Sequence, residues 1–287
     1  MTQVFISTGG AQQTTATELA NRLLAMQSWP IELSGGTHED NVGSSIRMLA
    51  TRTPIMLHNY YPPPRVPFVL NIASDQPNIV SKSKLLVQNA LDIASTIGSK
   101  HYAIHAGFCT DPPVQSLGKV IQGDWQGKRS EALERMQGVI YELSDYARSR
   151  GVRLLIENHA LTRASLDACR ENPLLLTHTE EIVDFFLDLQ DHVGLLHDVG
   201  HLKVSSNTLQ FDLVQAIREL SALAEGLHLH DNAGVSDDHS SFDKEAWFFR
   251  HLSDRAAFAT VEVHSSDLSD ILSAANACQS FFSGNRV

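Results

Sequence analysis

Histidine and carboxylate side chains recur directly after short apolar segments along this 287-residue chain, which contains 14 histidines. Carboxylates and imidazoles are costly to bury without partners, and crowded carboxylates repel one another. A divalent cation removes both costs, because it attracts carboxylates and accepts the lone pairs of imidazole nitrogens. The pattern therefore predicts a metal centre. A mixed set of His, Asp and Glu ligands suits Zn²⁺, Mn²⁺, Fe²⁺ or Co²⁺ rather than Ca²⁺.

Eight short apolar segments, rich in β-branched residues, must position these groups. Such segments are typical of buried parallel strands, and here they alternate with helical patterns. Eight repeats predict the α/β class and a single (β/α)₈ TIM barrel, with residues 1–287 forming one domain because no linker interrupts them. The expected strands are Val4–Ser7, Pro30–Leu33, Pro54–Leu57, Tyr102–His105, Arg153–Glu157, Val193–His197, Gly226–His230 and Ala259–Val263.

Helical spacing of apolar residues predicts the intervening elements. No Gly-x-Gly-x-x-Gly pattern follows the first strand, which disfavours a dinucleotide-binding open sheet. The expected helices are Thr15–Met26, Val42–Leu49, Ser81–Ile97, Ser130–Ala147, Glu180–Leu189, Leu209–Leu223, a short Asp243–Leu252 and Asp267–Phe281.

Active sites of such barrels lie where the strands end. Alternate residues of a strand share a face, so we expect His228 to face the same way as His230, Glu157 as His159, and Glu262 as His264. Seven of the eight strands thus direct an imidazole or carboxylate to one mouth. In chain order these groups are Glu32, His58, His105, Glu157, Asp198, His201, His228, His230, Asp231, Asp237, His239, Glu262 and His264.

Composition narrows the possible partners and location. The formal net charge of −11 argues against a broad grip on nucleic acid, which depends on Lys and Arg, so we expect no useful affinity for duplex DNA. No apolar run is long enough to suggest a membrane span. The three cysteines are far apart in the sequence, and no signal peptide is recognised, which together predict a reduced protein in the cytoplasm.

Several of these motifs resemble the xylose-isomerase-like barrel superfamily, and within it the endonuclease IV branch. The similar segments are Ile156-Glu157-Asn158-His159, His197-Asp198-Val199-Gly200-His201, Leu227-His228-Leu229-His230, Asp237-Asp238-His239 and Val261-Glu262, with His58 and Ile104-His105-Ala106-Gly107 in the first half. The resemblance implies a bridging core, a second metal environment and a third one, and hence one to three ions per chain, with zinc or manganese expected. The implied ligands are Glu157, Asp198, His228 and Glu262 for the core, His58 and His105 with Glu157 bridging for the second environment, and His201, Asp237 and His239 for the third.

The chain also departs from the endonuclease pattern. The segment 34–40 after the second strand is acidic where a DNA-binding member would have Arg, and 240–243 replaces a Gly-rich stretch. Relatives with the same ligands include sugar and sugar-phosphate isomerases and epimerases, so the ligands alone leave the reaction open.

Three functions therefore remain. The first is isomerisation or epimerisation of a small sugar or sugar phosphate, with Glu157 and Glu262 moving a proton beside a carbonyl. The second is metal-dependent phosphoester hydrolysis at a cluster of ions. The third is a non-catalytic, metal-dependent sugar-binding barrel. Metal-bound imidazoles commonly donate their other nitrogen to a neighbour, so the remaining polar groups are expected to support the ligands or touch substrate: Glu32, His159, His230, Asp231 and His264.

Overall fold

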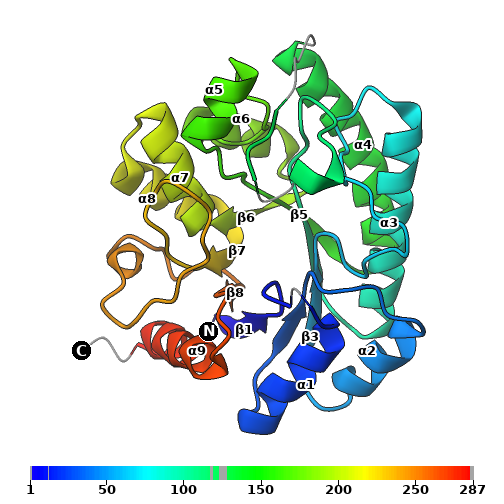
Figure 1. Ribbon diagram of the computed structural model, residues 1–287, viewed down its shortest axis with the longest axis vertical. Helices are drawn as coiled ribbons and strands as arrows, with labels where there is room; N and C mark the ends of the chain where they lie inside the picture. Colours follow the sequence, from blue (N-terminus) through cyan, green and yellow to red (C-terminus); the bar gives the residue numbers. More distant parts are fainter. Residues whose placement is uncertain (1, 12, 117–118, 123–127, 285–287) are drawn as a thin grey trace.

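A closed ring of eight parallel strands forms the centre of the computed structural model, which describes residues 2–11, 13–116, 119–122 and 128–284. Each strand pairs with its neighbours in sequence, and β8 closes the ring against β1 (Figure 1). The strands are β1 (Gln3–Ser7), β2 (Ile31–Leu33), β3 (Ile55–His58), β4 (His101–His105), β5 (Arg153–Glu157), β6 (Gly194–Asp198), β7 (Ala224–Leu229) and β8 (Phe258–Val261).

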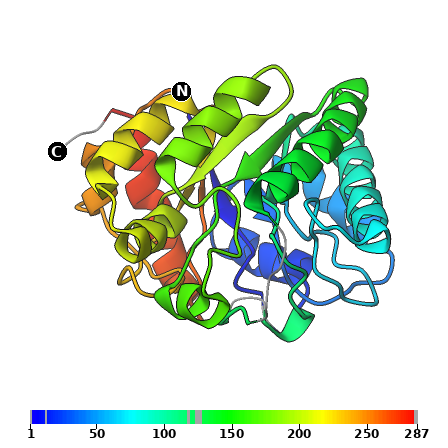
Figure 2. The same cartoon turned by 90° about the horizontal axis from the view of Figure 1, so that it is seen from above.

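Helices surround the strands in both views, and α9 packs beside β1 (Figures 1 and 2). No helix of the described residues is long and apolar enough to cross a membrane. The helices are α1 (Ala16–Met26), α2 (Val42–Ala50), α3 (Pro77–Thr96), α4 (Arg129–Ser149), α5 (Arg163–Cys169), α6 (Thr179–Leu189), α7 (Val199–Leu209), α8 (Leu213–Leu223) and α9 (Leu268–Phe282), with 3₁₀ turns η1 (Val114–Ser116) and η2 (Trp247–Arg250).

The inside of the barrel is divided into an apolar layer and a polar layer. Phe5, Met56 and Phe258 are buried together at the starts of their strands. Gly226 lies against this layer, and a Cβ atom there would stand 2.3 Å from a ring carbon of Phe258. The apolar layer closes the amino end of the barrel, which leaves the carboxyl end for polar groups.

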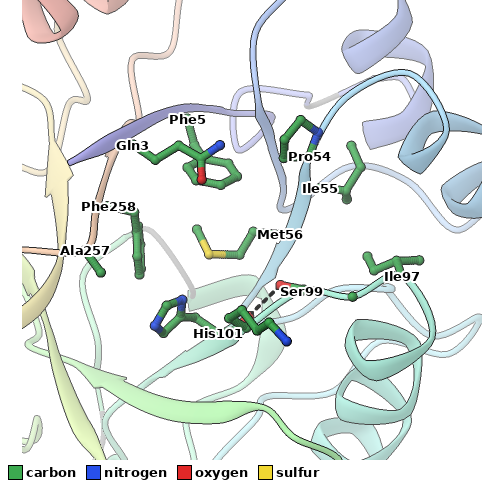
Figure 3. Close-up of a pocket in the computed structure, with 12 residues that line it drawn as sticks. Gln3, Phe5, Pro54, Ile55, Met56, Ile97, Ser99, His101, Ala257 and Phe258 are labelled. Atoms are coloured by element: carbon green, nitrogen blue, oxygen red, sulfur yellow. Dashed lines mark hydrogen bonds between the residues drawn. The ribbon is translucent and has the colours of Figure 1, made fainter. Parts of the chain in front are cut away.

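A cavity of about 290 Å³ lies at this amino end, where the lining residues begin their strands. Figure 3 shows Phe5, Met56 and Phe258 around it, together with His101. Burial lowers the pKa of His101, and Glu225 and Arg153 act on it in opposite directions. The histidine and carboxylate groups named from the sequence lie at the other end of the barrel, so this cavity is not their site.

The predicted (β/α)₈ barrel is confirmed, and most strand boundaries agree within two residues. The cysteines Cys109, Cys169 and Cys278 are buried free thiols, as expected. Burial raises the pKa of the Cys109 thiol to about 11.

The structure differs from the helix predictions in four places. The expected helix Leu209–Leu223 begins only at Leu213, as α8, because Leu209 ends α7, Gln210 adopts a left-handed conformation with φ 63° and Asp212 caps α8. Helix α7 was missed because it is buried on most faces and so lacks amphipathic spacing. The expected helix Asp243–Leu252 forms only η2, whose preceding residue Ala246 has a ψ of 130°. The seven-residue α5 was not predicted at all.

Candidate functional site

Strand register brings the predicted polar residues to one level at the carboxyl mouth. His105 is the Cα partner of Glu157 across β4 and β5, and Asp198 is the partner of His228 across β6 and β7. Glu262 follows β8 directly. Parallel strands end at the same edge, so short side chains from neighbouring strands meet there.

Glu157, Asp198, His228 and Glu262 form the most deeply buried group, which we call the core cluster. Each offers one ligand-type atom, and these four atoms lie within 4.8 Å of one another. The Nδ1 atom of His228 lies 3.3 Å from Glu157 Oε1, 3.1 Å from Glu262 Oε2 and 3.9 Å from Asp198 Oδ2. Three carboxylates therefore converge on one imidazole nitrogen.

The polar atoms of the core cluster do not satisfy one another, and they are suited to bind a cation. Both carboxylate oxygens of Glu157, Oδ2 of Asp198 and Nδ1 of His228 are buried, and none has a hydrogen-bond partner among the described residues. Buried polar atoms are normally paired, so several orphaned atoms at one point require an explanation. A divalent ion bound by two or three carboxylates and one imidazole supplies it, since these donors suit Zn²⁺ or Mn²⁺.

A second cluster shares Glu157 with the core. The Nε2 atoms of His58 and His105 lie 3.2 Å and 3.1 Å from the same oxygen, Oε2 of Glu157. His58 is buried, whereas 31% of the His105 side chain is exposed. Glu157 thus turns one oxygen to each cluster, and His105 lies at the solvent side.

A third cluster lies beside the core on α7 and the loop after β7. The Nε2 atoms of His201 and His239 each lie 3.1 Å from Oδ2 of Asp237. His230 joins this cluster, because its ligand atom and those of the other three lie within 4.8 Å of one another. The sequence placed His230 among the supporting residues, so its position in this cluster is a finding of the structure.

Electrostatics hold these carboxylates ionised and several of these imidazoles protonated. Burial opposes ionisation of Glu157, but His105, His228 and His58 hold its pKa well below the usual range. Burial likewise favours neutral His228, yet the carboxylates around it raise its pKa well above the ordinary value. The pKa of His239 rises to about 9, because the hydrogen bond to Asp237 and the charge of Glu262 outweigh burial. A cation that enters must displace these protons.

Glu32 supports His228 from the side away from the core cluster. Its Oε2 atom lies 3.1 Å from His228 Nε2 and accepts a 3.1 Å hydrogen bond from Thr260. With Nε2–H directed at Glu32, the Nδ1 lone pair of His228 points to the core. Thr260 was not named from the sequence, although its register opposite His228 on β8 explains its role.

Two predicted supporting residues lie outside all the clusters. His159 donates to the Ala106 carbonyl from Nε2 at 2.6 Å, and its ring lies 5.3 Å from that of His105. Burial and the charge of His105 lower its pKa to about 3. Asp231 binds Lys203 and Trp247 at 2.6 Å and 3.0 Å, which orders the loop rather than the clusters.

His264 lies beside the third cluster and the core. Its ring stacks on His239 with centroids 4.0 Å apart. Gly9 leaves room next to it, because a Cβ atom there would stand 2.9 Å from His264 Nε2 and 3.0 Å from Glu262 Oε1.

Asn158, which was not named as a site residue from the sequence, holds the backbone of Asp198. Its side-chain oxygen accepts a hydrogen bond from the Asp198 amide at 2.8 Å, and its side-chain nitrogen donates to the Asp198 carbonyl.

Fold and site together define the class of protein: a (β/α)₈ barrel that gathers imidazoles and carboxylates at its carboxyl mouth. Residues 44–276 match the family model described as the xylose isomerase-like TIM barrel. The chain belongs to that family. A search of curated proteins gave no match.

Solved structures share the fold along nearly the whole chain. A D-tagatose 3-epimerase-like protein superposes with a TM-score of 0.72 at 16% identity, covering 98% of this chain and 97% of that one. D-allulose 3-epimerase from Methylomonas sp., in complex with D-allulose, gives 0.68 at 14% identity and covers 100% and 97%. A Thermus thermophilus protein soaked with ZnCl2 gives 0.60 at 19% identity and covers 96% and 98%. At such identities the likeness shows a common fold.

Proposed function

We propose that this protein is a divalent-metal-dependent isomerase or epimerase that acts on a small sugar or sugar phosphate. One observation carries the proposal: Glu157 and Glu262 approach the same atom, Nδ1 of His228, from strands β5 and β8. In the ring, β6 and β7 separate these two strands. A substrate carbon held between the two carboxylates has a group on each side that is able to accept a proton.

In the proposed reaction, one ionised carboxylate takes the proton from the carbon next to a carbonyl. The opposite face of that carbon regains a proton from water, or from the other carboxylate after it has itself taken a proton from solvent. Both carboxylates are held ionised by neighbouring histidines, Glu157 by His105 and Glu262 by His228, against the effect of burial. A divalent cation in the core cluster, when bound, supplies positive charge that polarises the carbonyl and stabilises the charge that develops next to it. The apolar layer closes the amino end of the barrel, so a substrate reaches the site from the carboxyl mouth.

The relatives support this class of reaction. Two of the solved structures with this fold are a D-tagatose 3-epimerase-like protein and a D-allulose 3-epimerase bound to D-allulose. Both names refer to small sugars. The acidic balance of the chain, with a net charge of −11, also suits a neutral sugar better than a polyanion.

Phosphoester hydrolysis is the second candidate, because the clusters around His58 and His105 and around His201 and Asp237 place further ligand-type groups beside the core. Neighbouring ions are able to stabilise both the attacking and the leaving oxygen of a phosphoester. Duplex DNA remains an unexpected substrate for a chain with this charge.

Solvent-deuterium incorporation distinguishes the candidates. The metal-loaded protein is incubated in D₂O with ketoses, aldoses and their phosphates, and exchange at the carbon next to the carbonyl is followed by NMR. Glu157→Gln and Glu262→Gln should each lower exchange by at least about 100-fold, the usual contribution of a general acid or base, whereas Glu219→Gln on the exposed face of α8 should not. Phosphate release without any exchange contradicts the isomerase and supports the hydrolase. Metal analysis of each variant separates loss of the ion from loss of the acid–base group.

A further inference from the structure

His230 is a fully buried histidine that the proposed reaction does not use. We propose that His230 is the fourth protein ligand of a closed cation site formed with His201, Asp237 and His239, and that this site takes Zn²⁺ to fasten the loop after β7. Three protein ligands leave a coordination position open to water or substrate, whereas four close a tetrahedral site and make it structural. His230 therefore decides which kind of site the third cluster is.

The tautomers of the three histidines favour this assignment. The Nδ1 atoms lie 2.8 Å from the Asn158 carbonyl for His201, 2.9 Å from the Glu262 carbonyl for His239, and 3.4 Å from the Asp231 carbonyl for His230. A carbonyl oxygen only accepts hydrogen bonds, so Nδ1 carries the hydrogen in each ring. When an ion displaces the proton from Nε2, that atom offers its lone pair to the ion, while Nδ1–H keeps its carbonyl partner.

Two buried atoms of the cluster lack a hydrogen bond. Among the described residues, neither Nε2 of His230 nor Oδ1 of Asp237 has a hydrogen bond, although both are buried. They lie 3.6 Å apart. The Nε2 atom of His230 is also 3.2 Å from Asp198 Oδ1, but without hydrogen-bond geometry. A buried nitrogen without a bond costs free energy, which an ion at this point recovers.

The spacing of the ligand atoms is close to that of a tetrahedral zinc site. Zinc bonds of about 2.0–2.2 Å place neighbouring ligand atoms roughly 3.3–3.6 Å apart. In the cluster, Oδ2 of Asp237 lies 3.1 Å from Nε2 of both His201 and His239, and Oδ1 of Asp237 lies 3.6 Å from Nε2 of His230. One ligand atom from each of the four residues lies within 4.8 Å of the others, so a modest closing of the cluster reaches the zinc spacing. The rings of His230 and His239 stack at 24°, so ion binding must open the angle between them.

The chain holds the His230 ring firmly from behind. Gly200, in the first turn of α7, lies flat against it, and a Cβ atom there would stand 2.1 Å from His230 Cε1. Asp237 and His239 come from a loop whose ends are bridged by Asp231 and Ser240. An ion bound by all four ligands would tie this loop to α7 and β7, at the edge of the core cluster.

Cobalt substitution tests the proposal without any sugar. Metal-free protein is titrated with Zn²⁺ and with Co²⁺, and bound ions are counted by elemental analysis. The wild-type protein should show the strong visible absorption of four-coordinate Co²⁺. His230→Asn should bind one ion fewer, or bind it at least about tenfold more weakly, and should lose that absorption, while the exposed His38→Asn control keeps both.

Each outcome decides the question. Unchanged stoichiometry, affinity and spectrum in His230→Asn would mean that His230 only supports Asp198. Absence of four-coordinate absorption in the wild-type protein overturns the closed site even if His230→Asn fails to fold. Glu157→Gln, which removes a core ligand, should leave the four-coordinate signal in place. Deuterium exchange into sugars does not enter these measurements, so the closed site and the proposed reaction succeed or fail separately.

Discussion

Replacement of Glu32 by Gln tests how the core cluster is oriented. The carboxylate of Glu32 faces His228 Nε2 at 3.1 Å and accepts from Thr260 at the same distance, and both partners are fully buried. Gln keeps the shape and one carbonyl acceptor but removes the negative charge. The His228 imidazole then becomes a weaker and less firmly oriented ligand through Nδ1.

Two effects of opposite sign determine how far Glu32→Gln changes the metal affinity. Loss of a supporting partner behind a metal-bound histidine costs about 10–100-fold in metal affinity, or about 1.4–2.8 kcal/mol. Glu32 also helps to raise the pKa of His228 in the metal-free protein, so its removal weakens proton competition and offsets part of that loss near neutral pH. The loss of affinity should therefore grow as pH rises, because competition by protons disappears there.

Zn²⁺ affinity of the wild-type, Glu32→Gln and Glu219→Gln proteins is measured by competition with a chelator across a range of pH. Glu219 lies on the exposed side of α8 and serves as the matched charge control. The expected result is a loss of about 10–100-fold for Glu32→Gln at the alkaline end and no loss for the control. Equal affinities of Glu32→Gln and wild type at every pH would refute the assignment of Glu32 as the support of a metal ligand.

Zn²⁺ binding should release protons, because His228, His201 and His239 have raised pKa values in the metal-free protein. Calorimetry in buffers of different ionisation enthalpy counts the released protons. A Zn²⁺ affinity that fails to rise from about pH 6 to about pH 8 contradicts the prediction. Gly226→Ala should lower the free energy of unfolding by about 1–3 kcal/mol by overpacking the apolar layer, whereas Gly138→Ala, whose Cβ meets no described atom within 4 Å, should raise it by about 0.5–1 kcal/mol; urea unfolding that shows both variants shifted the same way speaks against this packing.

The barrel was predictable because buried parallel strands have a strong local pattern. Segments such as Arg153–Glu157 are short, apolar and followed by a polar group. Helix α7 escaped prediction for the opposite reason: buried on most faces, it has no polar stripe to mark its period. The mistaken helix at Asp243–Leu252 has helix-like spacing, but Phe248 and Phe249 pack with Phe242 in an aromatic cluster that favours a single 3₁₀ turn.

Residue type and strand order predicted that these groups meet at one mouth, and the family resemblance implied their division into three clusters. The entry of His230 into the third cluster and the direction of each carboxylate oxygen were not predicted. Nothing in the order of residues shows that Glu157 turns one oxygen to His58 and His105 and the other to His228. His159 lies two residues beyond the end of β5 and no longer follows the alternation of that strand, so it lies outside the clusters. His230 directly follows β7 and enters a cluster. Thr260 has an ordinary side chain, and only its register with His228 marks it.

Asp198 both caps helix α7 and belongs to the core cluster. Its Oδ1 atom accepts the 2.6 Å hydrogen bond from the His201 amide that starts α7, while Oδ2 is turned to the core cluster. Asn or Ser caps a helix about as well as Asp, but neither brings the negative charge that the core cluster uses. A single substitution of Asp198 by Asn or Ser should therefore keep helix α7 and remove a carboxylate from the core cluster. In relatives that keep the barrel but have lost the proposed activity, we expect this position to be among the first to change.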